Sequence, residues 1–572
     1  DGHASTACLV EDGQVRAMAS EERFNRIKNY GGPPVKTVDW ILKDAQISPE
    51  CLNAISIVGI NEPISGISAY KKGRHQLFPL MTRLLPASVL SSPALTKIYL
   101  SAKSRRRRRY ETSTEILQKL KREPGDVQPV EHHEAHAYSA YFSSGYQHLP
   151  GETLLITADG SGDGLSASIS IGRGYHVERI ATIHSYHSLG MFYSRVTQYL
   201  GMKPLEHEYK VMGLAPYAPD RDRKLAYEAL KGYFSLSDDG LSFVNHSRSW
   251  GNSMIRKLQQ DLFLIRFDGV AAATQQIFEE LFMQFILNWI EKTGIHRVAA
   301  GGGSFMNVKF NMLLLDRPEV GEIYFLPSCG DESIALGAAY KAYLDAAQAK
   351  GVEGRIEPLG PLYFGWQVTE NEITAALEKH RGEIQFEKCA DIERRTAELM
   401  AEGKIIGRVR GRMEWGARAL GNRSIVASPD RLEVVRRINT AIKMRDFWMP
   451  FAPSILWERR SDYIIDARDY DAPYMIVAFE STPLARKEVI AGLHPSDLTC
   501  RPQLVRQEWN PAYHRLLSEF EALTGIGAVL NTSFNLHGDA IVMTAEDAIY
   551  TLLNSGLDFV SIEDYLVSRI GR

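Results

Sequence analysis

The chain has 572 residues, a length at which a globular protein divides into two or more domains instead of enlarging one core. Hydrophobic residues make up 44% and charged residues 24%, and the formal net charge is -3. This balance is ordinary for a globular protein and gives no general attraction to nucleic acid or to an anionic membrane, so we expect neither as a partner.

Other sequence features bear on the compartment. The five cysteines are scattered with no close pair, which argues against a disulfide framework or a thiolate zinc site and favours a reducing cytoplasm. No apolar run is long enough to cross a bilayer, and residues 1–20 do not resemble a signal peptide. Because the chain opens at Asp1 and not at a methionine, we expect further residues upstream.

Predicted strands come first along the chain. Apolar residues 6–10, the turn pair Asp12-Gly13 and a second strand ending near residue 19 indicate a β-hairpin. A similar unit recurs, in which a buried strand at residues 153–156 is turned by Asp159-Gly160 and followed by a hairpin over residues 165–180. Two such units predict a duplicated α/β architecture.

Helices and an insertion lie around these strands. Apolar spacing of 3.6 residues predicts helices at residues 35–44, 136–143 and 270–293. Residues 60–125 do not fit the duplicated pattern, since they hold several prolines and the run Arg105 to Arg109. We interpret this run as a solvated basic turn on an inserted segment, and a surface that meets phosphate or another anionic partner is the alternative.

A domain boundary is predicted where residues 346–361 become rich in glycine and then carry two prolines. We therefore divide the chain into a first domain at residues 1–350 and a second at residues 351–572. The second domain is also expected to be α/β. Its predicted strands are residues 405–409, 454–456, 474–479 and 528–530.

Two histidines and two carboxylates suggest a metal site in the first domain. His132 and His136 are four residues apart, so a helix places both imidazoles on one face, where they can bind one divalent ion. Asp159 follows a buried strand, and Asp331 precedes an apolar helix start. This mixed nitrogen and oxygen set suits iron(II), manganese or zinc better than calcium. A pair of ordinary surface histidines is the alternative.

Two glycine-containing loops suit a nucleotide. Gly160 follows Asp159 directly, and Gly301, Gly302 and Gly303 stand between a predicted strand and a helix that begins near residue 305 and carries Asn307. Glycines let backbone N–H groups approach a phosphate, and a helix N-terminus favours its negative charge. The spacing matches neither a Walker A loop nor the Rossmann fingerprint, and a tight turn with no ligand is the alternative.

Basic residues gather among glycines and small polar residues in the second domain. Arginine suits bidentate phosphate recognition and lysine adds a point charge, so this pattern predicts a concave pocket for a polyphosphate or an acyl phosphate. A salt-bridged surface explains any one arginine but not the clustering. The candidate ligands are Arg412, Arg418, Arg423, Lys443, Arg445, Arg501, Asn531 and Ser533.

These motifs resemble a known superfamily. Asp159-Gly160, the triple glycine at residues 301–303 and the His132/His136 pair are similar to the actin/Hsp70/sugar-kinase (ASKHA) superfamily and to its TsaD-type branch, whose HxxxH metal site serves carbamoyl transfer to tRNA. Longer signatures resemble the NodU/CmcH/TobZ family of O-carbamoyltransferases, which modify nodulation factors and antibiotics. They are EERF at residues 21–24, SLGMFYS at residues 188–194 and EYKVMGLAPY at residues 208–217.

The resemblance spans nearly the whole chain and implies a fold and a reaction. The fold is a duplicated ASKHA domain followed by a YrdC-like α/β domain. The second domain is expected to form carbamoyl adenylate from carbamoyl phosphate and ATP with Mg²⁺. The first domain is then expected to transfer the carbamoyl group to a hydroxyl of a small natural product, with iron(II) as the favoured metal.

The same resemblance assigns roles to three residues. His3 matches the family's catalytic histidine and is the candidate base, because a neutral imidazole accepts protons near neutral pH. Lys28 and Lys210 are candidates to orient the carbamoyl carbonyl. The chain departs from the family at Ala4, where relatives usually carry aspartate, and Asp1 is the expected substitute. A second, milder departure is Gly-Asp-Ala at residues 538–540 in place of Gly-Glu-Pro.

Two other functions remain open. One is a tRNA-directed threonylcarbamoyl transferase, although the fusion of both domains, the signature at residues 208–217 and the near-neutral charge favour a small acceptor. The other is a nucleotide-dependent regulatory ATPase of the ASKHA fold, which needs neither the histidine pair nor the arginine-rich second domain. The acceptor is not readable from the sequence, so aminoglycoside, macrolide, ansamycin, cephem and oligosaccharide all remain open, as does a homodimer.

Overall fold

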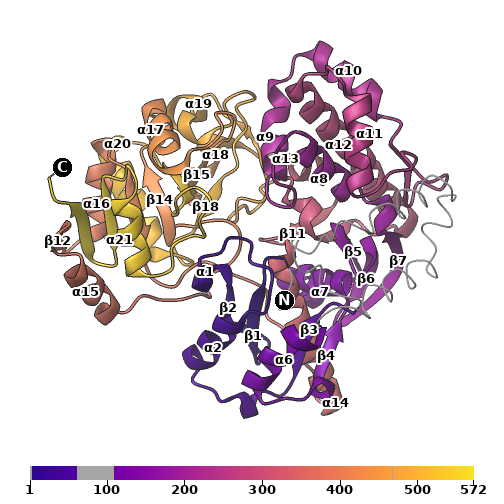
Figure 1. Ribbon diagram of the computed structural model, residues 1–572, viewed down its shortest axis with the longest axis horizontal. Coiled ribbons are helices and arrows are strands. Elements are labelled where there is room, and N and C mark those ends of the chain that lie inside the picture. The colour runs from indigo at the N-terminus through magenta and orange to yellow at the C-terminus, as the bar shows by residue number, and fades with distance from the viewer. Residues whose placement is uncertain (1–2, 61–108, 467, 572) are drawn as a thin grey trace. The chain divides into compact units, whose positions relative to one another are not determined.

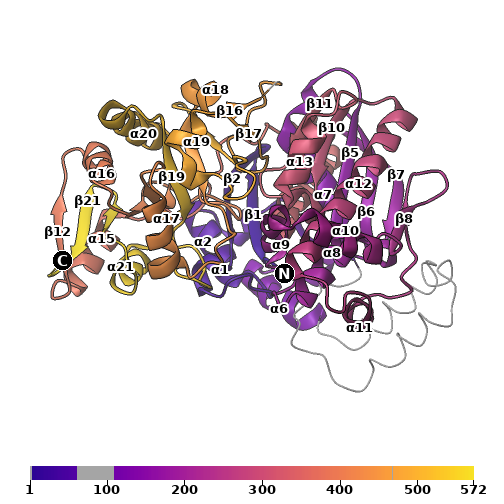
Figure 2. The same cartoon turned by 90° about the horizontal axis from the view of Figure 1, so that it is seen from above.

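The structure is a computed structural model that describes residues 3–60, 109–466 and 468–571 (Figure 1). Helices and strands alternate throughout these residues, which confirms the α/β class (Figure 2). Most of the predicted insertion, with its arginines 105–108, lies outside the described residues, and so does Asp1. Within the described ranges, no helix is both long enough and apolar enough to cross a membrane.

Contacts divide the chain into two compact units. Unit 1 comprises Asp1–Arg16 and Asn29–Leu359, and unit 2 comprises Ala17–Lys28 and Gly360–Arg572. The break at residue 359 lies close to the one proposed at residue 350, but the sequence does not predict that residues 17–28 belong to unit 2. These residues join unit 2 because their first three side chains are buried and the Met18 N–H donates to a backbone carbonyl of that unit.

Unit 1 is built on a five-stranded sheet in the order β11-β10-β5-β6-β7. The first three strands in the chain form an antiparallel meander, and β10 pairs in parallel with both β5 and β11. Helices α7 and α8 both pack on β5, which explains why residues 153–158 are buried. The bounds are β5 (Thr153–Gly162), β6 (Leu165–Arg173), β7 (His176–His184), β10 (Arg297–Gly301), β11 (Glu322–Phe325), α7 (His132–Ser144) and α8 (Leu189–Tyr199).

The predicted turn at Asp159-Gly160 is wrong. Strand β5 continues to Gly162 with a shift of register after Ala158, and the chain turns only at Asp163 and the glycine that follows it, both at positive φ. The short run of glycine and serine lets the backbone bulge and then resume pairing. Asp159 therefore lies inside a β-bulge, a feature that redirects side chains and often borders functional sites.

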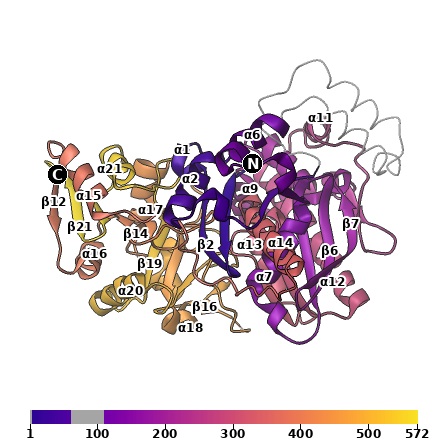
Figure 3. The same ribbon diagram turned by 90° about the horizontal axis from the view of Figure 1, so that it is seen from below.

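The remaining strands of unit 1 form pairs. The predicted N-terminal hairpin is confirmed as β1 (Thr6–Glu11) and β2 (Gln14–Ser20), although β2 belongs to unit 2 from Ala17 onward. Strand β3 (Ile55–Val58) pairs in parallel with β4 (Val127–Val130). Helix α14 (Ile334–Ala349) packs on β1, β3 and α7. Figure 3 shows α14 next to α7. Duplication of the five-stranded unit stays a prediction, because these strands are seen only as pairs within the described residues.

The helices predicted in the first domain form. Two of them are confirmed as α2 (Val35–Asp44) and α12 (Phe267–Thr293), and the third, α7, begins at His132 rather than at residue 136. The other elements of unit 1 are α6 (Arg109–Leu120), α9 (Glu208–Leu214), α10 (Asp220–Leu230), α11 (Asn252–Asp261), α13 (Val308–Leu315), β8 (Phe234–Leu236) and β9 (Phe243–Asn245).

Unit 2 contains an eight-stranded mixed sheet in the order β12-β21-β20-β13-β14-β19-β15-β18. Its strands are β12 (Ile384–Lys388), β13 (Ile406–Val409), β14 (Arg423–Ala427), β15 (Ala452–Leu456), β18 (Gln503–Val505), β19 (Ala528–Ser533), β20 (Phe559–Ile562) and β21 (Tyr565–Arg569). The helices around it are α1 (Glu22–Asn25), α15 (Glu370–Lys379), α16 (Ile392–Ala401), α17 (Leu432–Ile438), α18 (Arg460–Tyr463), α19 (Ala485–Glu488), α20 (Pro511–Thr524) and α21 (Ala545–Leu553). Apolar side chains of these elements form a continuous core.

Three of the four strands predicted in unit 2 exist, as β13, β15 and β19, and the fourth is wrong. Residues 474–479 are buried but irregular, and only Phe479 makes an isolated bridge, with Cys500. Met475 has a φ of +57°, which an extended strand does not tolerate. The apolar run correctly predicts that these residues are buried, but it wrongly predicts an extended strand. Two further strands, β16 (Ile464–Ile465) and β17 (Glu480–Ser481), form a short pair beside it.

Candidate functional site

Helix α7 carries both predicted metal-binding histidines. It begins at His132 because the Glu131 carboxylate accepts the N–H groups of His133 and Glu134 and so caps the helix. His136 lies one turn further along and is fully buried. The spacing of four residues places both imidazoles on one face of the helix, and their ring centroids are 4.8 Å apart.

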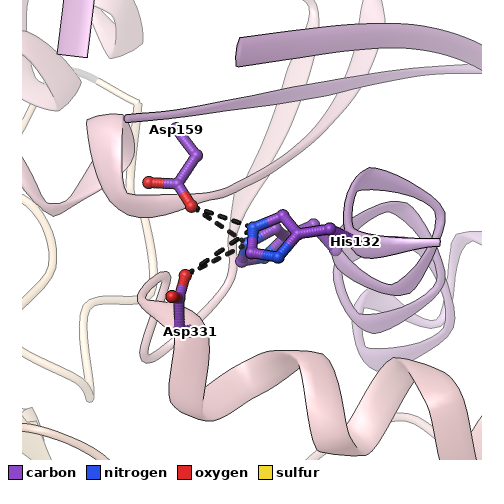
Figure 4. Close-up of side chains that lie close together, drawn as sticks. His132, Asp159 and Asp331 are labelled. Atoms are coloured by element: carbon purple, nitrogen blue, oxygen red, sulfur yellow. Dashed lines mark hydrogen bonds and ion pairs between the residues drawn. The ribbon is translucent and has the colours of Figure 1, made fainter. Parts of the chain in front are cut away.

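Two carboxylates face these imidazoles (Figure 4). Asp159 Oδ2 lies 3.0 Å from Nε2 of His132 and 3.6 Å from Nε2 of His136. Asp331 Oδ1 lies 3.7 Å and 3.8 Å from the same two nitrogens. One ligand atom from each residue lies within 4.8 Å of the other three. The structure thus brings together the four residues that the sequence singles out, from three separate segments, as one cluster.

The four-residue cluster fits a divalent ion. Bonds of about 2.0–2.2 Å to nitrogen and oxygen place neighbouring ligand atoms about 3–4 Å apart, and the four distances between imidazole nitrogens and carboxylate oxygens fall in this range. Nε2 of His136 is buried without a hydrogen-bond partner in the described parts of the chain, whereas its Nδ1 lies 3.3 Å from the Ser333 hydroxyl. A metal-binding histidine typically forms a hydrogen bond through one ring nitrogen and binds the ion through the other. The donors suit iron(II), manganese or zinc.

Charges within the four-residue cluster shift the pKa values of His132 and Asp159. Burial lowers the pKa of His132, but the hydrogen bond with Asp159 and the charges of Asp331, Asp159 and Asp163 outweigh burial and raise the pKa to about 9. Burial raises the pKa of Asp159, but the hydrogen bond with His132, the close contact with His136 and the charges of both imidazoles outweigh it and hold that pKa well below its usual value. The metal-free cluster therefore carries an extra proton at neutral pH.

We predict that the metal-free protein loses thermal stability as the pH rises from about 6.5 to 9. Because the folded pKa of His132 lies above the unfolded value, its stabilisation is complete below about pH 6.5 and is lost as the pH passes about 9. Bound manganese(II) replaces the proton, so the loss should shrink when the metal is present. Calorimetry of both forms checks this, and a metal-free protein equally stable at both ends of the range would contradict the charge arrangement.

Glycines let the backbone close around the cluster. A Cβ on Gly162 would lie 2.1 Å from the His132 ring, and one on Gly303 would lie 2.8 Å from Oδ1 of Asp159. Gly302 has a φ of +92°, and a Cβ there would meet the backbone of β5 at 2.3 Å. Only glycine fits these positions. The triple-glycine loop that the sequence links to nucleotide therefore lies directly beside a carboxylate of the cluster.

The other residues predicted to bind nucleotide surround this loop. The Gly160 N–H donates to Oδ1 of Asp159 at 2.6 Å, and Gly301 ends β10 against the backbone of α7. Asn307 caps α13 with its side-chain oxygen, and its amide nitrogen donates to Gln275 at 2.9 Å. These contacts hold the loop and the helix behind it in one arrangement.

The predicted catalytic residues divide between the two units. His3 and Lys210 belong to unit 1, where Nε2 of His3 lies 3.2 Å from the Leu205 carbonyl oxygen. His3 and Asp331 line the same cavity, of about 610 Å³. Lys28 belongs to unit 2, although the resemblance gives it a role in transfer. The structure therefore groups Lys28 with the residues predicted to bind anions.

Lys443 is the centre of that group. It ends a π-helical turn, and its buried Nζ donates to the carbonyl and hydroxyl oxygens of Ser533 and to Oδ1 of Asn535. Burial, followed by the charges of Arg445 and Lys28, holds the pKa of Lys443 well below its usual value. A π-helical turn is rare and frequently marks a functional site.

Arg501 extends the same group. Burial, followed by the charges of Arg418 and Arg445, holds the pKa of Arg501 well below its usual value. The guanidinium of Arg445 also lies 5.2 Å from the centroid of the Phe451 ring. Cations that depress one another's pKa are stabilised when an anion binds between them. We call this group the cationic cluster, and its members are Lys28, Arg418, Lys443, Arg445 and Arg501.

Three residues predicted to bind anions are engaged with the protein itself. Arg423 is fully buried, and its guanidinium donates to four backbone carbonyls. Nη2 of Arg412 donates to the Phe364 carbonyl at 2.9 Å. The Asn531 amide donates to the Ala419 carbonyl and to two side chains. In the structure these three side chains form hydrogen bonds within unit 2, and their binding of an anion stays a prediction.

Asn535 ends the Asn-Thr-Ser-Phe-Asn run that the sequence assigns to the predicted pocket, and its Oδ1 accepts a hydrogen bond from Nζ of Lys443. The sequence does not predict the role of the EERF signature, in which buried Arg23 donates to the Gly416 carbonyl at 2.9 Å. Arg26, two residues beyond it, donates to two further carbonyls of unit 2. No local pattern reveals contacts across almost 400 residues of sequence.

Comparison with known proteins identifies the family. The profile described as Carbamoyltransferase N-terminus matches residues 2–340, and the profile described as Carbamoyltransferase C-terminus matches residues 397–569. The chain therefore belongs to the carbamoyltransferase family. The predicted resemblance to the NodU/CmcH-type proteins is confirmed, and carbamoyl transfer is the general activity that this membership supports.

Individual relatives agree with this assignment. Nodulation protein NolNO of Sinorhizobium fredii is 32% identical over 581 residues, covering 99% of this chain and 79% of NolNO. The 3'-hydroxymethylcephem-O-carbamoyltransferase of Amycolatopsis lactamdurans is 28% identical over 272 residues, covering 47% of this chain and 48% of that protein. Component A of (R)-2-hydroxyglutaryl-CoA dehydratase from Acidaminococcus fermentans covers 60% of this chain and 94% of its own, with 14% identity and a TM-score of 0.31, too low to support a conclusion.

Proposed function

We propose that the chain is an O-carbamoyltransferase that forms carbamoyl adenylate in unit 2 and transfers its carbamoyl group to a hydroxyl in unit 1. One observation carries this proposal: a single chain of the carbamoyltransferase family holds two chemically different sites. Unit 1 has two imidazoles and two carboxylates suited to a metal ion, and unit 2 has five cations suited to phosphates. Two sites of this kind suit two successive steps.

The first step belongs to the cationic cluster. Loss of phosphate from carbamoyl phosphate, with uptake of water, gives carbamate, and a carbamate oxygen attacks the α-phosphorus of ATP. The bond to pyrophosphate breaks, and carbamoyl adenylate and pyrophosphate form. Arg418, Arg445 and Arg501 can bind the phosphate oxygens, and Lys443 adds a point charge held in place by Ser533. Mg²⁺ accompanies ATP in this step.

The second step belongs to unit 1. His132, His136, Asp159 and Asp331 would hold a divalent ion, with iron(II) preferred, and this ion would stabilise negative charge on the adenylate phosphate. The glycine loop at residues 301–303 offers backbone N–H groups to the nucleotide. His3 takes the proton of the acceptor hydroxyl, and Lys210 orients the carbamoyl carbonyl. The hydroxyl oxygen then bonds to the carbamoyl carbon, and AMP leaves.

The acceptor and the folds complete the proposal. We assign an ASKHA fold to the first domain and a YrdC-like fold to the second, in line with the motifs that carry the resemblance. A natural-product hydroxyl is the proposed acceptor class, supported by the relative named for a hydroxymethylcephem. The net charge of -3 argues against tRNA as acceptor, since a tRNA-binding surface needs an excess of basic residues.

The proposed function is tested by the fate of ATP. We expect pyrophosphate release from ATP only when carbamoyl phosphate is present, at a rate independent of threonine and of tRNA. A regulatory ATPase would release phosphate from ATP without carbamoyl phosphate, and a threonylcarbamoyl transferase would need threonine. Either pattern, measured by a coupled pyrophosphate assay beside a phosphate assay, would overturn the proposal.

A further inference from the structure

His3 lacks the partner that the family pattern provides. The aspartate expected after this histidine is replaced by Ala4, whose methyl group cannot form a hydrogen bond. Ala4 has a φ of +54°, a conformation in which aspartate and asparagine are several times more common than other residues that carry a side chain. Asp1, the expected substitute, lies outside the described residues. The group that orients the imidazole ring is therefore sought among the described residues.

The contact with Leu205 fixes the tautomer of His3. Nε2 of His3 lies 3.2 Å from the Leu205 carbonyl oxygen, and a carbonyl oxygen only accepts hydrogen bonds. Nε2 must therefore carry the proton of this bond. A neutral imidazole has a single N–H, so Nδ1 is left without a proton. Nδ1 is the nitrogen that can accept one.

Leu205 is held in an unfavourable conformation. Its φ of +66° lies in the left-handed region, which a leucine adopts only when its surroundings enforce it. The Leu205 N–H donates to Oε1 of Glu208 at 2.7 Å, and Glu208 is the first residue of α9. The turn is closed on its other side by the Lys203 N–H, which donates to Nδ1 of His207 at 3.1 Å. The Glu208 carboxylate thus holds the N–H of the same residue whose carbonyl meets His3.

The side chains of Glu208 and His3 also interact electrostatically. Burial raises the pKa of Glu208, while the hydrogen bond from the Leu205 N–H and the positive charge that His3 can carry act to lower it. Glu208 and His3 are therefore within electrostatic range of each other.

We infer that Glu208 is a positioning residue that, through the left-handed turn at Leu205, holds His3 with Nδ1 as the proton acceptor. The inference rests on the proposed function, in which His3 acts on the acceptor hydroxyl. The hydroxyl proton moves to Nδ1, the hydroxyl oxygen bonds to the carbamoyl carbon, and the bond from that carbon to the AMP oxygen breaks with its electron pair. Glu208 touches none of the reacting atoms.

The test compares two substitutions of Glu208 in the full chain. The reaction holds carbamoyl phosphate, ATP, Mg²⁺ and iron(II), with ethanol as the hydroxyl probe and ethyl carbamate as the measured product. Glu208→Ala should lower kcat about 30-fold, part of the hundredfold or more that a general base supplies, with KM for ethanol changed less than about threefold. Glu208→Gln keeps an oxygen for the Leu205 N–H and should recover most of the rate.

Matched controls separate the inference from the proposed function. Glu206→Ala removes a neighbouring carboxylate that pairs with Lys203 and should leave the rate unchanged. Pyrophosphate release depends on unit 2 and should survive in every variant, which reports folding. If His3→Asn loses transfer while Glu208→Ala matches Glu206→Ala, the inference fails and the proposed function stands. If His3→Asn transfers at the wild-type rate, or wild type forms no ethyl carbamate, both fail.

The tautomer of His3 can also be measured directly, without an acceptor. In protein labelled with nitrogen-15 only at histidine, the His3 signals are those lost in His3→Asn. Wild type should show the Nε2–H tautomer alone, Glu208→Ala a mixture of both tautomers, and Glu206→Ala the wild-type pattern. An Nδ1–H tautomer in wild type, or an unchanged tautomer in Glu208→Ala, would overturn the inference.

Discussion

His136→Ala is expected to remove the bound divalent ion and carbamoyl transfer while sparing adenylate formation. The His136 ring is fully buried, and its Nε2 faces both carboxylates of the cluster, so alanine leaves three ligands around a partly open site. Transfer should fall about a thousandfold or more, which corresponds to about 4 kcal/mol of lost transition-state stabilisation. Elemental analysis and separate assays of pyrophosphate release and carbamate ester formation measure the three effects.

Controls for this prediction address folding. The alanine leaves a cavity and reduces the positive charge beside two partly buried carboxylates, so His136→Gln serves as a second variant of similar size. His176→Ala removes an exposed histidine of β7 in the same unit and should keep metal and transfer at wild-type levels. Full metal occupancy in a folded His136→Ala protein would refute the assignment of the metal site.

Lys443→Ala is expected to stop adenylate formation and to be rescued by supplied carbamoyl adenylate. An anion bound beside Arg445 and Lys28 would favour the charged form of Lys443, the buried side chain at the centre of the cationic cluster. Removing it should lower carbamoyl phosphate-dependent pyrophosphate release about a hundredfold or more, as loss of a preorganised charge does in other enzymes. Transfer from supplied carbamoyl adenylate uses unit 1 and should stay within about twofold of wild type.

Two further variants sharpen this second prediction. Lys443→Met keeps the length of the side chain without its charge, so it should fail as Lys443→Ala does if charge is what matters. Lys487→Ala removes an exposed lysine of α19 and should be neutral. A Lys443→Ala protein that remains inactive with supplied carbamoyl adenylate would show that unit 2 does more than activate the carbamoyl group.

Local patterns in the sequence predict the elements and part of the candidate site. The apolar period of 3.6 residues gives α2 and α12, and the turn pair at residues 12–13 gives the first hairpin. Local patterns also predict the metal-binding residues. The spacing of four residues puts both histidines on one helix face, and each aspartate lies beside the predicted end of a strand or start of a helix. The four atoms that they place together lie within 4.8 Å of one another.

Long-range pairing and side-chain direction are what the sequence does not reveal. The bulge that carries Asp159 depends on β6, and the assignment of residues 17–28 to unit 2 depends on contacts hundreds of residues away. Arg418 and Arg423 stand five residues apart in one motif, yet Arg423 turns inward to four carbonyls while Arg418 joins the cationic cluster. Residue type alone does not distinguish a phosphate ligand from a buried brace.

The central claim is that carbamoyl adenylate links the two units, and a trapping measurement tests it most directly. The full chain is mixed with radiolabelled carbamoyl phosphate, ATP and Mg²⁺ without acceptor, quenched and separated by chromatography. We predict that the label appears on a species containing AMP only when ATP is present, and that this species is consumed when acceptor is added to wild type but persists in His3→Asn. Carbamate ester that forms in wild type on adding acceptor without ATP, or with conversion of ATP to ADP, would contradict the account.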